Sequence, residues 1–337
     1  QKGHRKLSNV VSKIVENHLK LPGWRSVVRT CMMQFFRQDL DDIERLGYLK
    51  NQDEMLAFRR SLQFISLRGD YVKSQPEKRI ANFLYEHGIS YGYETAVGKG
   101  WGDRAYRPDF TIFPSDKKRP RIVLEYYGIK GNSSYDEMTE AKRDYWKNNK
   151  QYRYEEIFSK NLNRDDPHAL ELTLKSILEK NGVPCNKLSE QKIWELIKDR
   201  AITHFDTLIT QFIGRARKSK LTPQKLRTRI AQHKHINDCE VHFLRTAEKI
   251  YSDYLRKLET TGQEDFDGLI IKGASMVSGG NTMFSSNKGE GDLSRLAHLM
   301  IDEYQDFSEC FNDLLKSIRS QNKDLQTYCV GDDWQAI

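Results

Sequence analysis

The spacing of hydrophobic and polar positions divides the 337-residue chain into four segments. Apolar residues recur every three or four positions in the first and third segments, which predicts amphipathic helices. The second segment instead has short apolar runs between polar turns, which indicates strands beside a helix. The fourth ends in two apolar runs with a helix-like stretch between them. We therefore expect an α/β protein with segment boundaries at 1–70, 71–182, 183–262 and 263–337.

In the second segment the pattern predicts one helix and three strands. Pro76–Leu84 has the start signal and the apolar stripe of a helix. Strands are expected at Ser90–Glu94, Arg107–Phe113 and Ile122–Gly128, and the charged turn between the last two predicts a hairpin.

Three acids fall on these predicted elements: Glu77 on the helix, Asp109 on one strand and Glu125 on its hairpin partner. Carboxylates that converge in this way suit Mg²⁺ or Mn²⁺. Such a site can activate water and stabilise the leaving oxygen in phosphodiester cleavage. The order of Pro-Asp, hairpin and acid resembles the PD-(D/E)xK nuclease fold, and the stretch is similar to domains inserted in helicase IV-like proteins.

One position departs from the nuclease pattern. That family usually has a lysine two residues after the second acid, where this chain has Tyr127. Tyrosine lacks the positive charge that stabilises a pentavalent phosphate. A lysine from the following helix can replace it. Lys142 is the first choice because it shares a helix face with Met138 and Tyr145, and Lys130 is the second. The alternative is a degenerate nuclease fold that only binds DNA.

In the fourth segment, polar groups follow two apolar runs. Asp302, Glu303 and Gln305 follow the first, while Gly331-Asp332 and Gln335 follow the second. Ligands bind at the carboxyl ends of neighbouring parallel strands in open α/β sheets. Alternation along a strand would put Asp302 and Glu303 on opposite faces, so that one holds Mg²⁺ and the other orients water.

These two stretches resemble motifs II and III of the UvrD/Rep-like superfamily 1 helicases, particularly the DNA helicase IV branch. The resemblance implies that ATP and Mg²⁺ are cofactors, that Asp302 binds the metal and that Glu303 is the general base. It also implies that Gln305 and Gln335 couple the γ-phosphate state to DNA movement. Asp265–Ile270 is similar to the family segment shortly before motif II.

The implied fold is a partial RecA-like P-loop core plus a helical subdomain that carries the inserted nuclease-like α/β domain. The phosphate-binding pattern G-x-x-x-x-G-K-[ST] is absent from these residues. We therefore expect an internal piece of a longer helicase, with the remaining helicase domains as partners. Alone, it should not hydrolyse ATP efficiently. By family resemblance the intact protein would move 3′ to 5′ on single-stranded DNA.

The net charge of +8 fits a polyanionic partner. The family resemblance implies that this partner is DNA, both single-stranded and at junctions. A basic run begins at Ile213 and has no acid until Asp238, although many such runs are only solvated helix faces. The candidate DNA-binding residues are Arg215, Arg217, Lys218, Lys220, Arg227 and Arg229.

Five cysteines without a CxxC pair favour a reducing cytoplasm, and no apolar run is long enough to suggest a membrane partner. His235, Cys239 and His242 would share one face of a helix, but they match no known zinc pattern, so we interpret them as part of a half-exposed helix. Ser275–Asp292 is rich in Gly, Ser and Asn and predicts a mobile loop.

We interpret the chain as the middle portion of a UvrD-like helicase with an inserted, metal-dependent nuclease-like domain. Two alternatives stay open. The first is a metal-dependent DNA nuclease in its own right. The second is a non-catalytic DNA-binding module in which both sites are silent.

Overall fold

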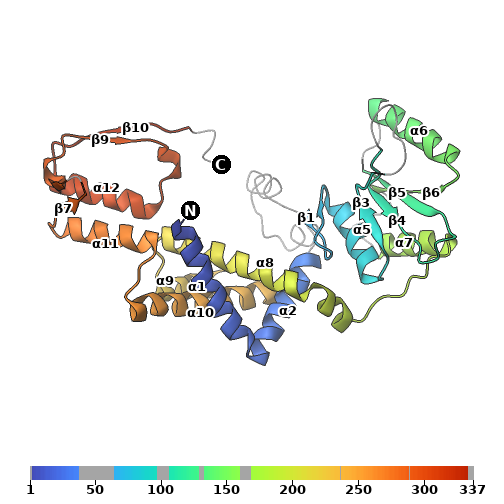
Figure 1. Cartoon of the computed structure of the whole chain (residues 1–337), viewed down its shortest axis with the longest axis horizontal. Helices are drawn as coiled ribbons and strands as arrows, with labels where there is room; N and C mark the ends of the chain where they lie inside the picture. Colours follow the sequence, from blue (N-terminus) through green and yellow to red (C-terminus); the bar gives the residue numbers. More distant parts are fainter. Residues whose placement is uncertain are drawn as a thin grey trace. The chain divides into compact units, whose positions relative to one another are not determined.

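The computed structural model describes residues 2–37, 64–96, 106–128, 133–159, 168–235, 237–287 and 289–332 (Figure 1). The chain forms two compact units. The α/β unit is Met32–Ala201, and the helical unit combines Gln1–Cys31 with Ile202–Ile337.

The α/β unit is built on a four-stranded sheet with the order β3-β4-β5-β6. Strands β3, β4 and β5 are antiparallel, whereas β6 runs parallel to β5. A small antiparallel pair, β1 and β2, precedes the sheet. The elements are β1 (Phe64–Ile65), β2 (Tyr71–Val72), α5 (Gln75–Glu86), β3 (Tyr91–Tyr93), β4 (Phe110–Ile112), β5 (Arg121–Tyr127), α6 (Ser133–Asn148), β6 (Tyr152–Phe158) and α7 (Ala169–Lys180).

Helices cover both faces of this sheet. Helix α5 starts at the N-cap Ser74, whose side chain accepts a hydrogen bond from the amide of Glu77. Its predicted stripe is buried, and α5 and α7 share one apolar core with β3, β4 and β5. Trp146 of α6 packs on Val123, in a separate core on the other face. The sequence therefore predicted the helix and its buried side correctly.

The first part of the helical unit consists of long helices whose apolar stripes form its core. They are α1 (Lys2–Leu19), α2 (Pro22–Arg37), α8 (Glu190–Lys218), α9 (Pro223–Gln232) and α10 (Asp238–Thr261), of which α2 and α8 extend into the α/β unit. Polar contacts fix α1: Ser12 donates to Asp206 at 2.6 Å, and His18 lies 2.8 Å from Asp253.

The rest of the helical unit is an α/β arrangement. Strands β9 and β10 are parallel and are connected by α12, which packs against α11. Val277, Ile318 and Leu325 form the small core between them. The elements are α11 (Phe266–Ser278), β7 (Met283–Ser286), β8 (Gly289–Asp292), β9 (His298–Ile301), α12 (Glu309–Gln321) and β10 (Gln326–Cys329), with short 3-10 turns at Leu293–Arg295 and Tyr304–Asp306.

The expectation of a loop at 275–292 was wrong. Helix α11 continues to Ser278, and β7 and β8 pair as an antiparallel hairpin. The hairpin register places Phe284 opposite Gly291, where a Cβ would meet the Phe284 ring. Glycine is thus a packing residue here rather than a sign of an irregular loop.

No helix in the described part of the chain combines the length and the apolar character needed to cross a membrane.

Candidate functional sites

The first candidate site lies in the α/β unit, where strand pairing brings Asp109 next to β5. Asp109 directly precedes β4, and its Oδ2 accepts a hydrogen bond of 2.8 Å from the backbone amide of Tyr126. Glu125 is on β5 and is 1% exposed. The hairpin predicted from sequence therefore places these two carboxylates side by side.

Two further groups hold the Glu125 carboxylate. The Nζ of Lys142 donates to Oε2 at 3.0 Å, and the Tyr106 hydroxyl donates to Oε1 at 2.6 Å. Helix α6 thus brings Lys142, the preferred replacement lysine, to the acid. Lys130 lies outside the described residues. Nothing in the sequence pattern pointed to Tyr106.

Glu77 lies on the first turn of α5, where the protein itself binds its carboxylate. Oε1 accepts from the Ser74 hydroxyl at 2.7 Å, and Oε2 accepts from the Tyr93 hydroxyl at 2.5 Å. The ligand atoms of Glu77, Asp109 and Glu125 do not all lie within 4.8 Å of one another, as far as the described residues are concerned. A cation held by all three would therefore require these carboxylates to move closer together.

Its surroundings disfavour the ionised form of the Asp109 carboxyl group. Burial, together with the neighbouring carboxylates of Glu125 and Glu77, raises its pKa to about 7, although the Tyr126 amide and Lys142 oppose the shift. A divalent cation would relieve this repulsion, because it favours the ionised form of each acid.

We expect the raised pKa of Asp109 to make stability fall with rising pH. The unfolded carboxyl ionises near pH 3.8, whereas the folded one holds its proton up to about pH 7. Between these values the folded state binds more protons, so this group lowers the unfolding free energy by about 1.4 kcal/mol per pH unit. Asp109→Asn should remove that slope.

Denaturant unfolding of the wild type and of Asp109→Asn, at several pH values without metal, tests this. Parallel stability profiles between pH 4 and pH 7 would contradict the expected titration.

Tyr127, at the usual lysine position, is buried in a polar network. Its hydroxyl lies 2.6 Å from that of Tyr154, which donates to Glu156 at 2.9 Å. Arg143 completes the network through a 2.6 Å ion pair with Glu156. Tyr127 therefore contributes packing and hydrogen bonding, and the cation of the site comes from α6.

The second candidate site follows β9 and β10 in the helical unit. The side chain of Gln305 connects the two loops: its amide nitrogen donates to Glu303, and its oxygen accepts from the Asp332 backbone amide at 2.9 Å. The backbone adds a 3.0 Å bond from the Tyr304 amide to the Val330 carbonyl. The parallel register thus brings the two predicted motifs together.

The alternation argument for Asp302 and Glu303 was wrong, because β9 ends at Ile301. Glu303 has a left-handed backbone with φ of 54°, and its amide donates to Asp302 Oδ1 at 3.0 Å. Both side chains are exposed on a turn. Gln335 lies outside the described residues.

Glycine at position 331 leaves room for the Gln305 side chain. A Cβ there would lie 2.6 Å from Gln305 Oε1. A larger residue there would displace the Gln305 carboxamide from its bond to the Asp332 amide.

A buried ion pair links the basic run to the segment before motif II. Asp265 is the N-cap of α11 and binds the Arg217 guanidinium through both oxygens, at 2.8 and 2.6 Å. It also accepts from the Tyr254 hydroxyl at 2.8 Å. The Arg217 side chain is only 12% exposed. The prediction of Arg217 as a DNA contact conflicts with this arrangement, because the side chain is largely buried and its Nε and Nη2 already bind Asp265.

The other basic candidates differ in their surroundings. Arg215, Lys218, Arg227 and Arg229 are exposed. Lys220 forms an ion pair with Asp313, and Arg227 pairs with Glu248 at 2.9 Å. Fewer residues of the basic run are therefore available to bind DNA than the sequence suggested.

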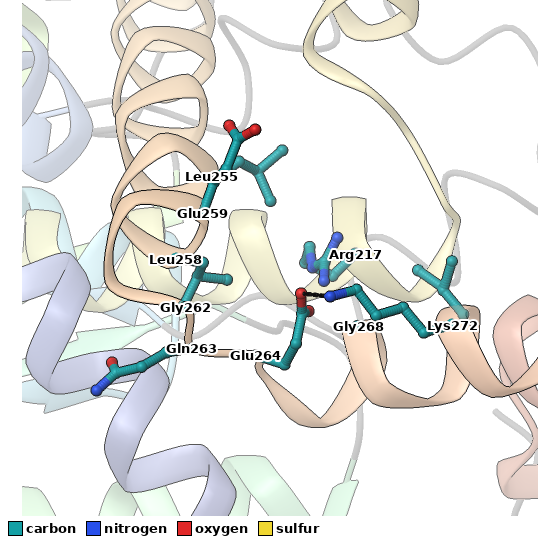
Figure 2. Close-up of a pocket in the computed structure, with 10 residues that line it drawn as sticks. Arg217, Leu255, Leu258, Glu259, Gly262, Gln263, Glu264, Gly268 and Lys272 are labelled. Carbon is teal, nitrogen blue, oxygen red and sulfur yellow. Dashed lines mark ion pairs between the residues drawn. The ribbon is translucent and has the colours of Figure 1, made fainter.

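A pocket lies beside this buried ion pair, lined by Arg217, Leu255, Gly268 and the ion-paired Glu264 and Lys272, among others (Figure 2). A Cβ at Gly268 would lie 2.5 Å from Arg217 Nη2 and 2.8 Å from Asp265 Oδ1.

Gly268→Ala should therefore destabilise the helical unit, by about 1–3 kcal/mol. The Arg217 guanidinium cannot move away without breaking its bonds to Asp265, and this cost outweighs the better helix propensity of alanine. Chemical denaturation measures the change, with Gly273→Ala in the same helix as the control because a Cβ there is unobstructed. Equal stabilities of the two variants would contradict the packing argument.

The sequence profile of the UvrD/REP helicase N-terminal domain matches residues 129–337. The chain therefore belongs to the UvrD/REP helicase family.

Among curated proteins it is similar to DNA helicase IV of Escherichia coli (strain K12), with 34% identity over 80 residues. The alignment covers 24% of this chain and 10% of the helicase, so the chain spans a small part of that relative. No solved structure matches. The profile begins within 71–182, so the boundaries of the inserted domain stay predictions.

Proposed function

We propose that this chain is part of an ATP-dependent DNA helicase that moves 3′ to 5′ on single-stranded DNA. The observation that carries the proposal is the Gln305 side chain, which joins Glu303 to the backbone of Asp332. Loss of the terminal phosphate next to Glu303 would then alter the hydrogen bonds of Gln305, and through them the position of the loop after β10. This is the physical requirement for coupling hydrolysis to movement.

The proposed roles follow from the chemistry of each group. Asp302 holds Mg²⁺, largely through water, because Mg²⁺ keeps most of its hydration shell. Glu303 accepts a proton from the attacking water. Gln305 and Gln335 sense the terminal phosphate, since an amide both donates and accepts hydrogen bonds.

The exposed faces of β9 and β10 support a larger RecA-type sheet. Met300 is 80% exposed and Tyr328 is 66% exposed. Parallel strands normally have both faces covered. We infer that further strands and helices of the helicase core cover these side chains in the assembled enzyme.

Strand unwinding tests the proposal. Full-length protein is incubated with ATP, Mg²⁺ and a short duplex that carries a single-stranded tail at either its 3′ or its 5′ end. Unwinding of the 3′-tailed duplex alone supports the proposed direction. Unwinding of the 5′-tailed duplex alone would refute the direction, and no ATP-dependent unwinding of either would refute the helicase function.

We also propose that Arg215 and Lys218 contact DNA phosphates, because they are the exposed cations near the end of α8. Lys218→Glu should weaken binding to single-stranded DNA. It should also reduce the slope of log K against log salt by roughly 0.7 for each phosphate that the variant no longer neutralises. Fluorescence anisotropy at several salt concentrations measures both.

Lys257→Glu is the matched control, because this lysine is exposed on α10 of the same unit and its replacement changes the net charge equally. Equal weakening in the two variants would indicate a general effect of charge and would reject the proposed contact.

A second candidate function is metal-dependent DNA cleavage by the α/β unit. It is favoured by the contact between Lys142 and Glu125, which supplies a cation where the usual lysine is missing. The proposed ligands are Glu77, Asp109 and Glu125, with Mg²⁺ or Mn²⁺ as the metal. The third possibility, a DNA-binding module with silent sites, predicts binding without cleavage.

A further inference from the structure

A cluster of two histidines and one glutamate lies at the turn between α9 and α10. One ligand atom from each of His233, His235 and Glu240 lies within 4.8 Å of the other two. Among the described residues, no other group of three His, Cys, Asp or Glu side chains meets this distance. His233 is the C-cap of α9, and Glu240 is in the first turn of α10. The two helices thus supply ligands from both sides of the turn.

The geometry is close to that of a bound ion. Ligand atoms around one tetrahedral zinc ion lie roughly 3.3–3.6 Å apart, given metal–ligand bonds of about 2.0–2.2 Å. His233 Nε2 and Glu240 Oε1 are already 2.9 Å apart. The rings of His233 and His235 are nearly perpendicular, with centroids 5.2 Å apart. The three ligand atoms, at most 4.8 Å apart, would have to adjust from these separations to those around a bound ion.

His235 provides an independent observation. Its Nδ1 is buried and has no hydrogen-bond partner in the described part of the chain. A buried polar atom without a partner costs free energy, and a metal bond at this nitrogen would remove that cost. The cluster is therefore not explained by internal hydrogen bonding alone.

We propose that His233, His235 and Glu240 bind a Zn²⁺-type transition-metal ion that fastens α9 to α10. Two imidazoles and one carboxylate suit Zn²⁺, Co²⁺ or Ni²⁺, whereas Mg²⁺ prefers oxygen ligands. Three protein ligands leave one position for water. The set differs from the helix-face set of His235, Cys239 and His242, because His235 lies in the turn before α10 begins.

Metal titration of this chain tests the proposal. After treatment with a chelator, the protein is titrated with ZnCl₂ in excess Mg²⁺, which occupies oxygen-ligand sites, and binding is followed by calorimetry. Thermal unfolding is recorded in parallel. We expect one tight site, a higher Tm with Zn²⁺, and visible absorption bands when Co²⁺ replaces Zn²⁺.

The variants His233→Asn, His235→Asn and Glu240→Gln should each weaken binding by at least about tenfold. Cys239→Ser and His242→Asn are the controls, and circular dichroism verifies that all five fold. Absence of tight binding by the wild type would overturn the proposal, as would equally weakened binding in the controls. If a cluster variant unfolds, its neighbouring variants and the Co²⁺ spectrum of the wild type still decide the question.

Discussion

Glu303→Gln is expected to lower the kcat of DNA-stimulated ATP hydrolysis by about 10²–10⁴-fold in the full-length protein. The amide keeps the size of the side chain and can still contact Gln305, but it cannot accept a proton from the attacking water. Affinity for ATP should change little, because the residue acts in the transition state rather than in nucleotide binding. Steady-state hydrolysis and binding of a fluorescent ATP analogue measure the two quantities separately.

Glu309→Gln is a suitable control, because Glu309 is an exposed acid at the start of α12, a few residues beyond Glu303. It should retain wild-type hydrolysis. A kcat for Glu303→Gln equal to that of the control would remove Glu303 from the catalytic role. Parallel decreases in kcat and in ATP affinity would indicate a binding role instead.

The backbone at Glu303 supports a functional role. A left-handed conformation is unfavourable for a residue with a Cβ, by roughly 1–2 kcal/mol. Glu303 nevertheless has φ of 54°, and it is held there by the bond from its amide to Asp302 and by the bond from Gln305 to its carboxylate. Such strained positions cluster at sites where a side chain must be oriented for function.

The parts of the two sites that are set by local periodicity were predictable from sequence. The apolar stripe of α5 indicated that Glu77 lies on the buried side of that helix. Helical spacing on α6 identified Lys142 as the residue that faces the sheet. The hairpin between β4 and β5 followed from its charged turn. In each case the position of the residue depends on one helix or on two consecutive strands, so the spacing of apolar and polar residues is enough to predict it.

Contacts between distant parts of the chain could not be predicted in the same way. Arg217 belongs to a basic run, but its partner Asp265 lies 48 residues further along the chain. The sequence therefore indicated that Arg217 is part of a DNA-binding surface, whereas in the structure it forms a buried ion pair. The histidine cluster is local in the chain and was missed for a different reason, since Glu240 had no recognisable ligand spacing and His235 lies in a turn rather than on the expected helix.

Lys142→Met should lower Mn²⁺-dependent DNA cleavage by the α/β unit by about 10²–10³-fold, if the proposed nuclease function holds. The methionine keeps the length and packing of the side chain on α6 but removes the charge that would stabilise the pentavalent phosphate. Cleavage of labelled single-stranded and branched DNA in Mn²⁺ measures the decrease. Lys150→Met, at an exposed lysine just after α6, is the matched control and should cleave normally.

Asp109→Asn separates loss of chemistry from loss of folding. The oxygen of the new side chain can still accept a hydrogen bond from the Tyr126 amide. The substitution removes a negative charge that would bind the metal, so cleavage should disappear. The same variant should be more stable than the wild type at pH 7 and above without metal, because the buried charge and its repulsion by Glu125 are gone. An inactive protein that melts at a higher temperature cannot owe its inactivity to misfolding. Undiminished cleavage by Asp109→Asn would reject the site, and a wild type that binds DNA without cutting it in either Mg²⁺ or Mn²⁺ would leave the α/β unit as a binding module.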